Sequence, residues 1–206
     1  MSHGFTPFVD LLQKLPAWDF TNATLFDAGA GSGELGFYIK ALTDTYRVKF
    51  KGTPHLIGCD INQNNVRRVG QGVYDDYFLW DLMKMPYTFL WKPPKFVACL
   101  LTLEHIQGGK SDSLKVLDYL ETLSPNLIIC VPNGNHLYNH MKEKEFNHYS
   151  IWHPKDFTSR GYTVYLLDEI GLGGLSRKIY DVYRSVVGSP PESILAIRDG
   201  CATTNE

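Results

Sequence analysis

The chain has 206 residues, which fits one domain or one domain with a tail, and its 44% of hydrophobic residues is enough to fill a core. A formal net charge of -2 gives no general indication of a nucleic-acid partner. Because the sequence has no C-x-x-C spacing, no signal-peptide pattern at its start and no apolar run near the roughly 20 residues that span a bilayer, we expect a soluble, cytoplasmic protein without a membrane partner.

Short apolar runs that end in turn residues alternate with stretches of helical periodicity in the first part of the chain. In chain order, the pattern predicts a helix at 8–15, a strand at 24–27, a helix at 34–45, a strand at 56–60, a helix at 64–70 and a strand at 77–81. Such alternation is typical of a parallel sheet with helices on both faces.

The second part continues the alternation and then changes character. It predicts a strand at 96–103, a helix at 111–123, a strand at 127–131 and a finishing pair of strands at 162–167 and 179–187. A pair without an intervening helix would add an antiparallel edge. We therefore expect an α/β fold with a mostly parallel seven-stranded sheet in one domain over 1–187. Residues 188–206 have weak periodicity and are expected to be a loosely ordered C-terminal tail.

A glycine-rich turn follows the first predicted strand. Residues 27–33 read DAGAGSG, so Asp27 ends the strand and Gly29, Gly31 and Gly33 precede a helix. Glycine permits positive φ and lets a ligand approach the backbone closely. The turn lies at the carboxyl end of a strand, where open α/β sheets bind ligands.

Two cofactors compete for this turn. Gly31, Gly33 and Gly36 match the G-x-G-x-x-G pattern of dinucleotide-binding proteins. A carboxylate at Asp27, however, would repel a diphosphate and attract a sulfonium or an α-ammonium group. The next acid at a strand end, Asp60, also comes later than the offset of roughly 20 residues expected for a nicotinamide cofactor. The turn therefore favours S-adenosylmethionine.

Four segments resemble the class I S-adenosylmethionine-dependent methyltransferases. Residues 25–33 (LFDAGAGSG) are similar to the first motif of that family, and 56–61 (LIGCDI) to the second; 80–82 (WDL) resemble its adenine-binding element, and 101–106 (LTLEHI) the end of its fourth strand. The resemblance covers about residues 20–187 in the family's order. It implies the Rossmann-like methyltransferase fold.

The resemblance also implies which residues bind the nucleoside part of S-adenosylmethionine. Asp60 would bond to the ribose, with Ile61 against the adenine. Asp81 would accept a hydrogen bond from the adenine amino group, and Leu82 would flank the ring. Taken singly, Asp60 is also a candidate helix N-cap and Asp81 a candidate turn residue.

The methionine part of the cofactor would lie at the glycine turn. By the same resemblance, Asp27, Gly29 and Gly31 would hold the aminocarboxypropyl end, and Thr102 and Leu103 would lie beside it. A glycine-rich connection that binds nothing is the alternative for the turn.

The acceptor side has catalytic candidates in Glu104 and His105, directly after the fourth strand. A general base is required only if the acceptor loses a proton as it attacks, and His105 is the candidate for that role. Its alternative is a residue that caps the strand or bonds to the backbone.

The segment after the fifth strand is rich in histidine and aromatic residues. Tyr149 and Trp152 would stack on a planar acceptor or pack beneath a lid. His136 and His140 have the spacing of a metal pair on a helix, but they lack an H-E-x-x-H pattern and a third ligand, so we predict no metal site.

Two absences narrow the acceptor. The chain has neither the Asn/Asp-Pro-Pro-Tyr/Phe element of amino methyltransferases acting on DNA bases nor a Pro-Cys nucleophile after the fourth strand. We therefore expect methyl transfer to an O or N atom of a small or medium-sized molecule. The alternatives are methylation of a protein or an RNA, and a non-catalytic module that binds S-adenosylmethionine or a partner.

Overall fold

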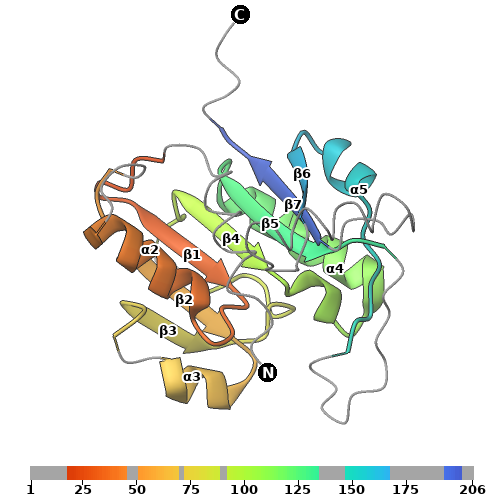
Figure 1. Ribbon diagram of the computed structural model, residues 1–206. Helices are drawn as coiled ribbons and strands as arrows, with labels where there is room; N and C mark the ends of the chain where they lie inside the picture. Colours follow the sequence, from red (N-terminus) through yellow and green to blue (C-terminus); the bar gives the residue numbers. More distant parts are fainter. Residues whose placement is uncertain are drawn as a thin grey trace, which may run out of the picture.

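The computed structural model describes residues 18–45, 51–69, 72–88, 92–134, 147–167 and 193–200. Seven strands form one sheet in the order β3-β2-β1-β4-β5-β7-β6, with β4 in the middle (Figure 1). This arrangement confirms the predicted α/β fold with a mostly parallel sheet.

The parallel part of the sheet consists of β1 (Thr24–Ala28), β2 (His55–Asp60), β3 (Asp76–Leu79), β4 (Phe96–Leu100) and β5 (Leu127–Pro132). The inner strands are nearly continuous apolar runs and are almost wholly buried. Such runs are expected for parallel strands that are covered on both faces. The carboxyl ends of these strands meet along one edge, which is where the predicted site residues lie.

Helices cover both faces of the sheet. Their bounds are α2 (Glu34–Thr45), α3 (Gln63–Val69), α4 (Gly109–Leu123), α5 (Pro154–Thr158) and the short 3-10 helix η1 (Leu103–His105). Along β1, the buried Leu25 packs in the same cluster as Ile39 of α2, whereas Phe26 packs with Leu117 of α4. Alternate strand residues therefore contact opposite helical layers. None of the described helices has both the length and the apolar character that crossing a bilayer requires.

The antiparallel part of the sheet corrects one prediction. Strand β7 (Ser193–Arg198) lies between β5 and β6 (Thr163–Leu167) and runs antiparallel to both. Its residues fall within the predicted loose tail, yet Ile194 to Ile197 are buried. The run is apolar on both faces, so it lacks the alternation of a half-buried strand. The predicted strand at 179–187 and the predicted helix at 8–15 lie outside the described residues.

The fourth strand ends earlier than predicted. Leu101 has a φ of +50°, a left-handed conformation that terminates the ladder after Leu100. The chain then turns into η1, which places Glu104 and His105 over the end of the sheet. The third strand is likewise shorter than predicted, so that Trp80 and Asp81 belong to the following loop.

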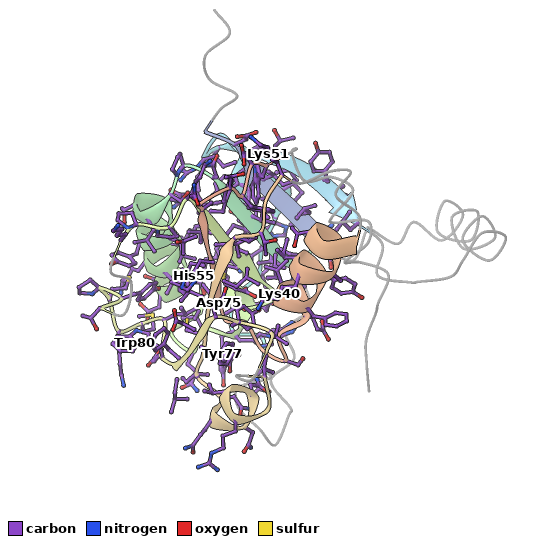
Figure 2. The ribbon with its side chains drawn as sticks, turned by 90° about the vertical axis from the view of Figure 1, so that its left-hand side faces the viewer. Lys40, Lys51, His55, Asp75, Tyr77 and Trp80 are labelled. Atoms are coloured by element: carbon purple, nitrogen blue, oxygen red, sulfur yellow. The ribbon has the colours of Figure 1, made fainter. Side chains whose placement is uncertain are left out.

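Strand β3 forms one edge of the sheet and is attached by polar contacts. The His55 Nε2 atom lies 2.9 Å from Asp76 Oδ2, and the Leu56 N–H donates to Asp75 Oδ2 at 2.7 Å. Figure 2 looks onto this edge, where Lys40 of α2 lies beside Asp75 with a distance of 3.6 Å between Nζ and Oδ1. Exposed pairs of this kind contribute little stability each. Tyr74, directly before Asp75, donates from its hydroxyl to Asp27 at the end of β1.

Candidate functional site

The glycine turn is attached to the end of β2 through its backbone. The N–H groups of Gly29 and Ala30 both donate to the carbonyl of Cys59, at 2.9 and 2.8 Å. The N–H of Gly31 donates to Asp60 Oδ2 at 2.9 Å. The turn and the strand-end acid are therefore one hydrogen-bonded unit.

The glycines of this turn are required for different reasons. Gly29 and Gly31 have φ values of +78° and +53°, which disfavour any residue with a Cβ atom. A Cβ atom at Gly29 would lie 2.3 Å from Thr102 Cγ2, so this glycine also permits close approach of β1 and the end of β4. A Cβ atom at Gly31 would meet nothing within 4 Å. The backbone of Gly31 therefore faces open space that a ligand can enter.

Asp27 lies beneath the turn and is only 2% exposed. Its Oδ2 atom accepts a short hydrogen bond of 2.5 Å from the Tyr74 hydroxyl, which in turn accepts from the Gly36 N–H at 3.3 Å. Burial raises the pKa of the Asp27 carboxyl to about 7, against the lowering by the Tyr74 hydrogen bond, and the nearby Asp60 adds to the increase. Near neutral pH, Asp27 is therefore close to its titration midpoint.

Tyr74 and Tyr77 support the turn, although no sequence motif includes them. The Tyr77 hydroxyl donates to the Gly31 carbonyl at 2.8 Å. The one sequence signal was Gly58 inside an apolar strand, because a strand glycine often marks a close approach. A Cβ atom there would lie 2.5 Å from the Tyr77 ring.

Asp60 has two structural roles at the end of β2. Its Oδ2 atom accepts from Gly31, while Oδ1 accepts from the Asn62 N–H at 2.7 Å and the Asn65 amide at 3.3 Å. Asp60 is not the helix N-cap, because α3 begins at Gln63 and Asn62 Oδ1 accepts from the Asn64 N–H at 2.8 Å. The Asp60 carboxylate borders a cavity.

A cavity of about 290 Å³ adjoins the carboxyl ends of β1, β2 and β4. Its walls include six of the residues predicted to bind the cofactor: Gly29, Asp60, Ile61, Asp81, Leu82 and Thr102. His105 closes the cavity from η1, next to Ile106. The volume is at the lower end of the ~300–1,000 Å³ typical of small-molecule sites.

The remaining predicted cofactor residues do not line this cavity. Asp27 is buried below the turn, Leu103 at the start of η1 is fully buried in the core, and Gly31 is not among the lining residues. The structure therefore separates residues that border the cavity from residues that support it.

Asp81 and Leu82 line the cavity from the loop after β3. Asp81 Oδ1 accepts from the Met83 N–H at 2.9 Å, which is the turn interaction that its position after β3 allowed. Leu82 is buried, whereas Ile61, which also lines the cavity, is 60% exposed. Two apolar side chains and a carboxylate thus border a space suited to a flat polar ring.

His105 is fixed at the acceptor end of the cavity. Its Nδ1 atom lies 3.0 Å from the Asn147 carbonyl oxygen, and its Nε2 atom lies 3.7 Å from Glu104 Oε1. Burial lowers the pKa of His105, partly offset by the Asn147 carbonyl and reinforced by His148. Since a carbonyl only accepts, the neutral ring carries its proton on Nδ1 and a lone pair on Nε2.

The aromatic residues predicted at the acceptor side differ in position. Tyr149 is partly exposed, and its N–H donates to the Glu104 carbonyl at 2.6 Å. Trp152 is fully buried, stacks on Phe157 at 5.1 Å between ring centroids, and has Lys110 Nζ 3.3 Å above its ring. Burial supports the packing interpretation of Trp152, and we leave it out of the proposed site. His136 and His140 lie outside the described residues.

A larger cavity of about 800 Å³ lies near the start of β5 and contains none of the predicted residues. Its two arginines are already paired: Arg160 lies 2.7 Å from Asp118 and 3.1 Å from Glu121, and Arg198 lies 3.7 Å from Glu121. Paired charges offer little to a ligand, so the smaller cavity is the candidate site.

Comparison with known proteins bears on the fold. No protein-family model matches the sequence. No curated protein matches it either.

Solved structures do match. A methyltransferase from Mesorhizobium loti matches with a TM-score of 0.57 and 12% identity, and the match covers 93% of this chain and 97% of the other. A methyltransferase from Archaeoglobus fulgidus matches with a TM-score of 0.55 and 15% identity, and the match covers 93% of this chain and 92% of the other. Both are described as S-adenosylmethionine-dependent.

Two further matches are methyltransferases with named acceptors. The small RNA methyltransferase HEN1 matches over 97% of this chain with a TM-score of 0.57 and 17% identity, and the matched part is 26% of the HEN1 chain. The plantazolicin methyltransferase BpumL, solved with S-adenosylhomocysteine, has a TM-score of 0.51 at 14% identity over 95% of this chain and 81% of its own. This chain therefore has the Rossmann-like fold of the class I S-adenosylmethionine-dependent methyltransferases.

Proposed function

We propose that the chain is an enzyme that transfers a methyl group from S-adenosylmethionine to an O or N atom of a small or medium-sized acceptor. The observation that carries the proposal is the composition of one cavity. Gly29, Asp60 and Asp81 border it on the cofactor side, and His105 borders it on the acceptor side. Both reactants of a direct transfer would thus meet in one cavity.

The nucleoside part of the cofactor would lie between β2 and the loop after β3. Asp60 would accept hydrogen bonds from the ribose hydroxyls, and Asp81 from the adenine amino group. Ile61 and Leu82 would contact the two faces of the adenine, which explains an exposed isoleucine beside a strand end.

The methionine part would lie over the glycine turn. Gly29 and Thr102 border the cavity there, and the open space at Gly31 admits a ligand without a steric clash. Asp27 would stabilise the positive α-ammonium group through the turn, together with Asp60. When bound, S-adenosylmethionine would supply a methyl group activated by its sulfonium charge.

Glu104 and His105 would prepare the acceptor for attack. The Nε2 lone pair of His105 is available to a proton of the acceptor, and the buried Glu104 carboxylate at 3.7 Å would stabilise the resulting imidazolium. Tyr149 is partly exposed and bonds through its N–H to the Glu104 carbonyl, and it would contact the acceptor.

Isothermal titration calorimetry with S-adenosylmethionine, S-adenosylhomocysteine and NADH tests the cofactor. We expect both adenosyl ligands to bind and NADH not to bind. Asp60→Ala should weaken binding by about 10- to 150-fold, which corresponds to about 1.5–3 kcal/mol for a hydrogen bond to a charged group.

Asp76→Ala is the matched control for Asp60→Ala, because Asp76 is an exposed strand acid that pairs with His55 away from the cavity. It should leave the affinity unchanged. Absence of binding by both adenosyl ligands, or equal loss in the two variants, would overturn the proposed cofactor site.

A further inference from the structure

Three side chains with metal-binding groups meet at the acceptor end of the cavity. One ligand atom from each of Glu104, His105 and His148 lies within 4.8 Å of the others. Within the described part of the chain, this is the group of His, Cys, Asp and Glu residues close enough to share a metal ion. The set joins a buried carboxylate to two partly buried imidazoles.

The hydrogen bonding of His105 directs a lone pair into this group. Its Nδ1 atom donates to the Asn147 carbonyl at 3.0 Å, which leaves Nε2 as an acceptor facing Glu104 Oε1 at 3.7 Å. A lone pair and a carboxylate oxygen at this distance are both able to bind the same cation. An imidazole whose second nitrogen donates to a backbone carbonyl is the usual arrangement of a metal-binding histidine.

The backbone holds the two halves of the cluster together. The N–H groups of Tyr149 and Ser150 both donate to the carbonyl of Glu104, at 2.6 and 3.3 Å. The Ser150 and Ser113 hydroxyls both donate to the Leu103 carbonyl, at 3.2 and 2.8 Å. These bonds fix the segment that carries His148 on η1, so the three ligands are positioned before any ion binds.

We propose that Glu104, His105 and His148 bind a divalent first-row transition-metal ion that holds and activates an acceptor hydroxyl. Two imidazoles and one carboxylate suit Mn²⁺, Co²⁺ or Zn²⁺ better than Mg²⁺, which prefers oxygen ligands. Three protein ligands leave coordination positions open for the acceptor, and His105 faces the cavity.

This inference rests on the proposed function and makes His105 a ligand in place of a proton acceptor. When bound, the ion would lower the pKa of the acceptor hydroxyl, whose proton would leave to solvent. The oxygen then forms the bond to the methyl carbon as the sulfur–carbon bond breaks, and the electron pair of that bond stays on sulfur. The acceptor atom is accordingly oxygen.

The test uses tag-free, full-length protein treated with a chelator and then titrated with Mn²⁺, Co²⁺, Zn²⁺ and Mg²⁺. We expect a higher thermal midpoint with the transition metals than with Mg²⁺. We also expect a visible absorption band when Co²⁺ binds, with one ion per chain by calorimetry. These readouts require neither acceptor nor turnover.

Loss of one ligand should weaken Co²⁺ binding at least about 10- to 100-fold. That range is already found when a residue that hydrogen-bonds to a metal ligand is removed. Glu104→Gln keeps the shape of the buried side chain, and His148→Gln alters a partly exposed position, so at least one variant should fold. His55→Gln is the control at a histidine at the start of β2 and should leave Co²⁺ binding unchanged. His136→Gln should also leave it unchanged, because the spacing of His136 and His140 alone predicts no metal site.

Unchanged Co²⁺ binding in both folded ligand variants, or no metal binding by the unaltered chain, would overturn this inference. S-Adenosylmethionine binding is measured in parallel on the same samples. Cofactor binding without metal binding rejects only the metal site, whereas metal binding without cofactor binding rejects the proposed function and leaves the metal site standing.

Discussion

The cofactor end and the acceptor end of the cavity are assembled in different ways. At the cofactor end, Gly31 follows β1 and Asp60 ends the adjacent parallel strand β2, and the Gly31 N–H donates to Asp60 Oδ2 at 2.9 Å. At the acceptor end, His105 meets Asn147, a residue 42 positions later in a loop that docks on η1. The geometry of the cofactor end follows from the order of the strands. The geometry of the acceptor end depends on how the segment that begins at Asn147 packs on η1.

This difference predicts that the two ends are separable in function. Substitutions at the cofactor end should change the affinity for S-adenosylmethionine. Substitutions at the acceptor end should change the rate of transfer and leave that affinity intact.

The largest expected effect is at the acceptor end. His105→Gln should lower methyl transfer at least about 100-fold, whether the imidazole acts as a base or as a metal ligand. The affinity for S-adenosylmethionine should change less than about twofold, which corresponds to roughly 0.5 kcal/mol, because His105 makes no proposed contact with the cofactor. Transfer of a radiolabelled methyl group to a panel of acceptors and calorimetry on the same protein measure the two quantities. A parallel loss of both would mean that the two ends are one unit.

The next effect concerns the glycine turn. Gly31→Ala should weaken S-adenosylmethionine binding at least about 10-fold, because a methyl group would occupy the open space at the turn and cost about 1.4 kcal/mol or more in contacts. Its cost in folding stability should be the ~1–2 kcal/mol of a left-handed conformation. Calorimetry and urea denaturation provide the two values.

Two other glycines are controls for Gly31→Ala. Gly161 has a φ of +80°, and a Cβ atom there would meet nothing within 4 Å, so Gly161→Ala should cost similar stability and no affinity. Gly29→Ala should lower stability more than either, because its Cβ atom would clash with Thr102. If Gly31→Ala bound the cofactor as tightly as Gly161→Ala, the open space would not be a binding surface.

The third effect is a pH dependence of the folding stability, which arises from Asp27 below the glycine turn. Folding raises the pKa of Asp27 from 3.8 to about 7, so the folded chain holds this proton more tightly than the unfolded chain. The resulting stabilisation is complete below about pH 4 and is lost as the pH rises through about 7. Each unit of pKa difference corresponds to about 1.4 kcal/mol.

In Asp27→Asn, the free energy of unfolding should therefore decrease less between pH 5 and pH 8 than in the unaltered chain. Urea denaturation at a series of pH values measures this decrease. Asp19→Asn is the control, because its hydrogen bonds to Thr21 lower the pKa of Asp19 to about 2 and place its titration below this window. An unchanged slope in Asp27→Asn would show that another group titrates there.

Much of the fold was predictable because strand order and burial leave local patterns. The continuous apolar runs of β1, β4 and β5 and the periodicity of α2 and α4 were all recognisable in the sequence. Strand β7 was not, because its apolar run follows a stretch rich in serine and proline and has no alternation. Position in the sheet, and not propensity, makes these residues a strand.

The candidate site was predictable to a similar degree. Asp60 and Asp81 border the cavity because each lies at or just after a strand end. The contact of Tyr74 with Asp27 spans 47 positions and has no motif, so only the structure places it. His148 was one histidine among several, and the backbone bonds that hold its segment on η1 distinguish it from the others.

A crystal structure of the chain with S-adenosylhomocysteine bound tests the central claim most directly. The account predicts the adenine between Ile61 and Leu82, the ribose hydroxyls on Asp60 and the amino acid end over Gly29 and Gly31. Density for the ligand elsewhere, such as in the cavity beside Arg160 and Arg198, would contradict it.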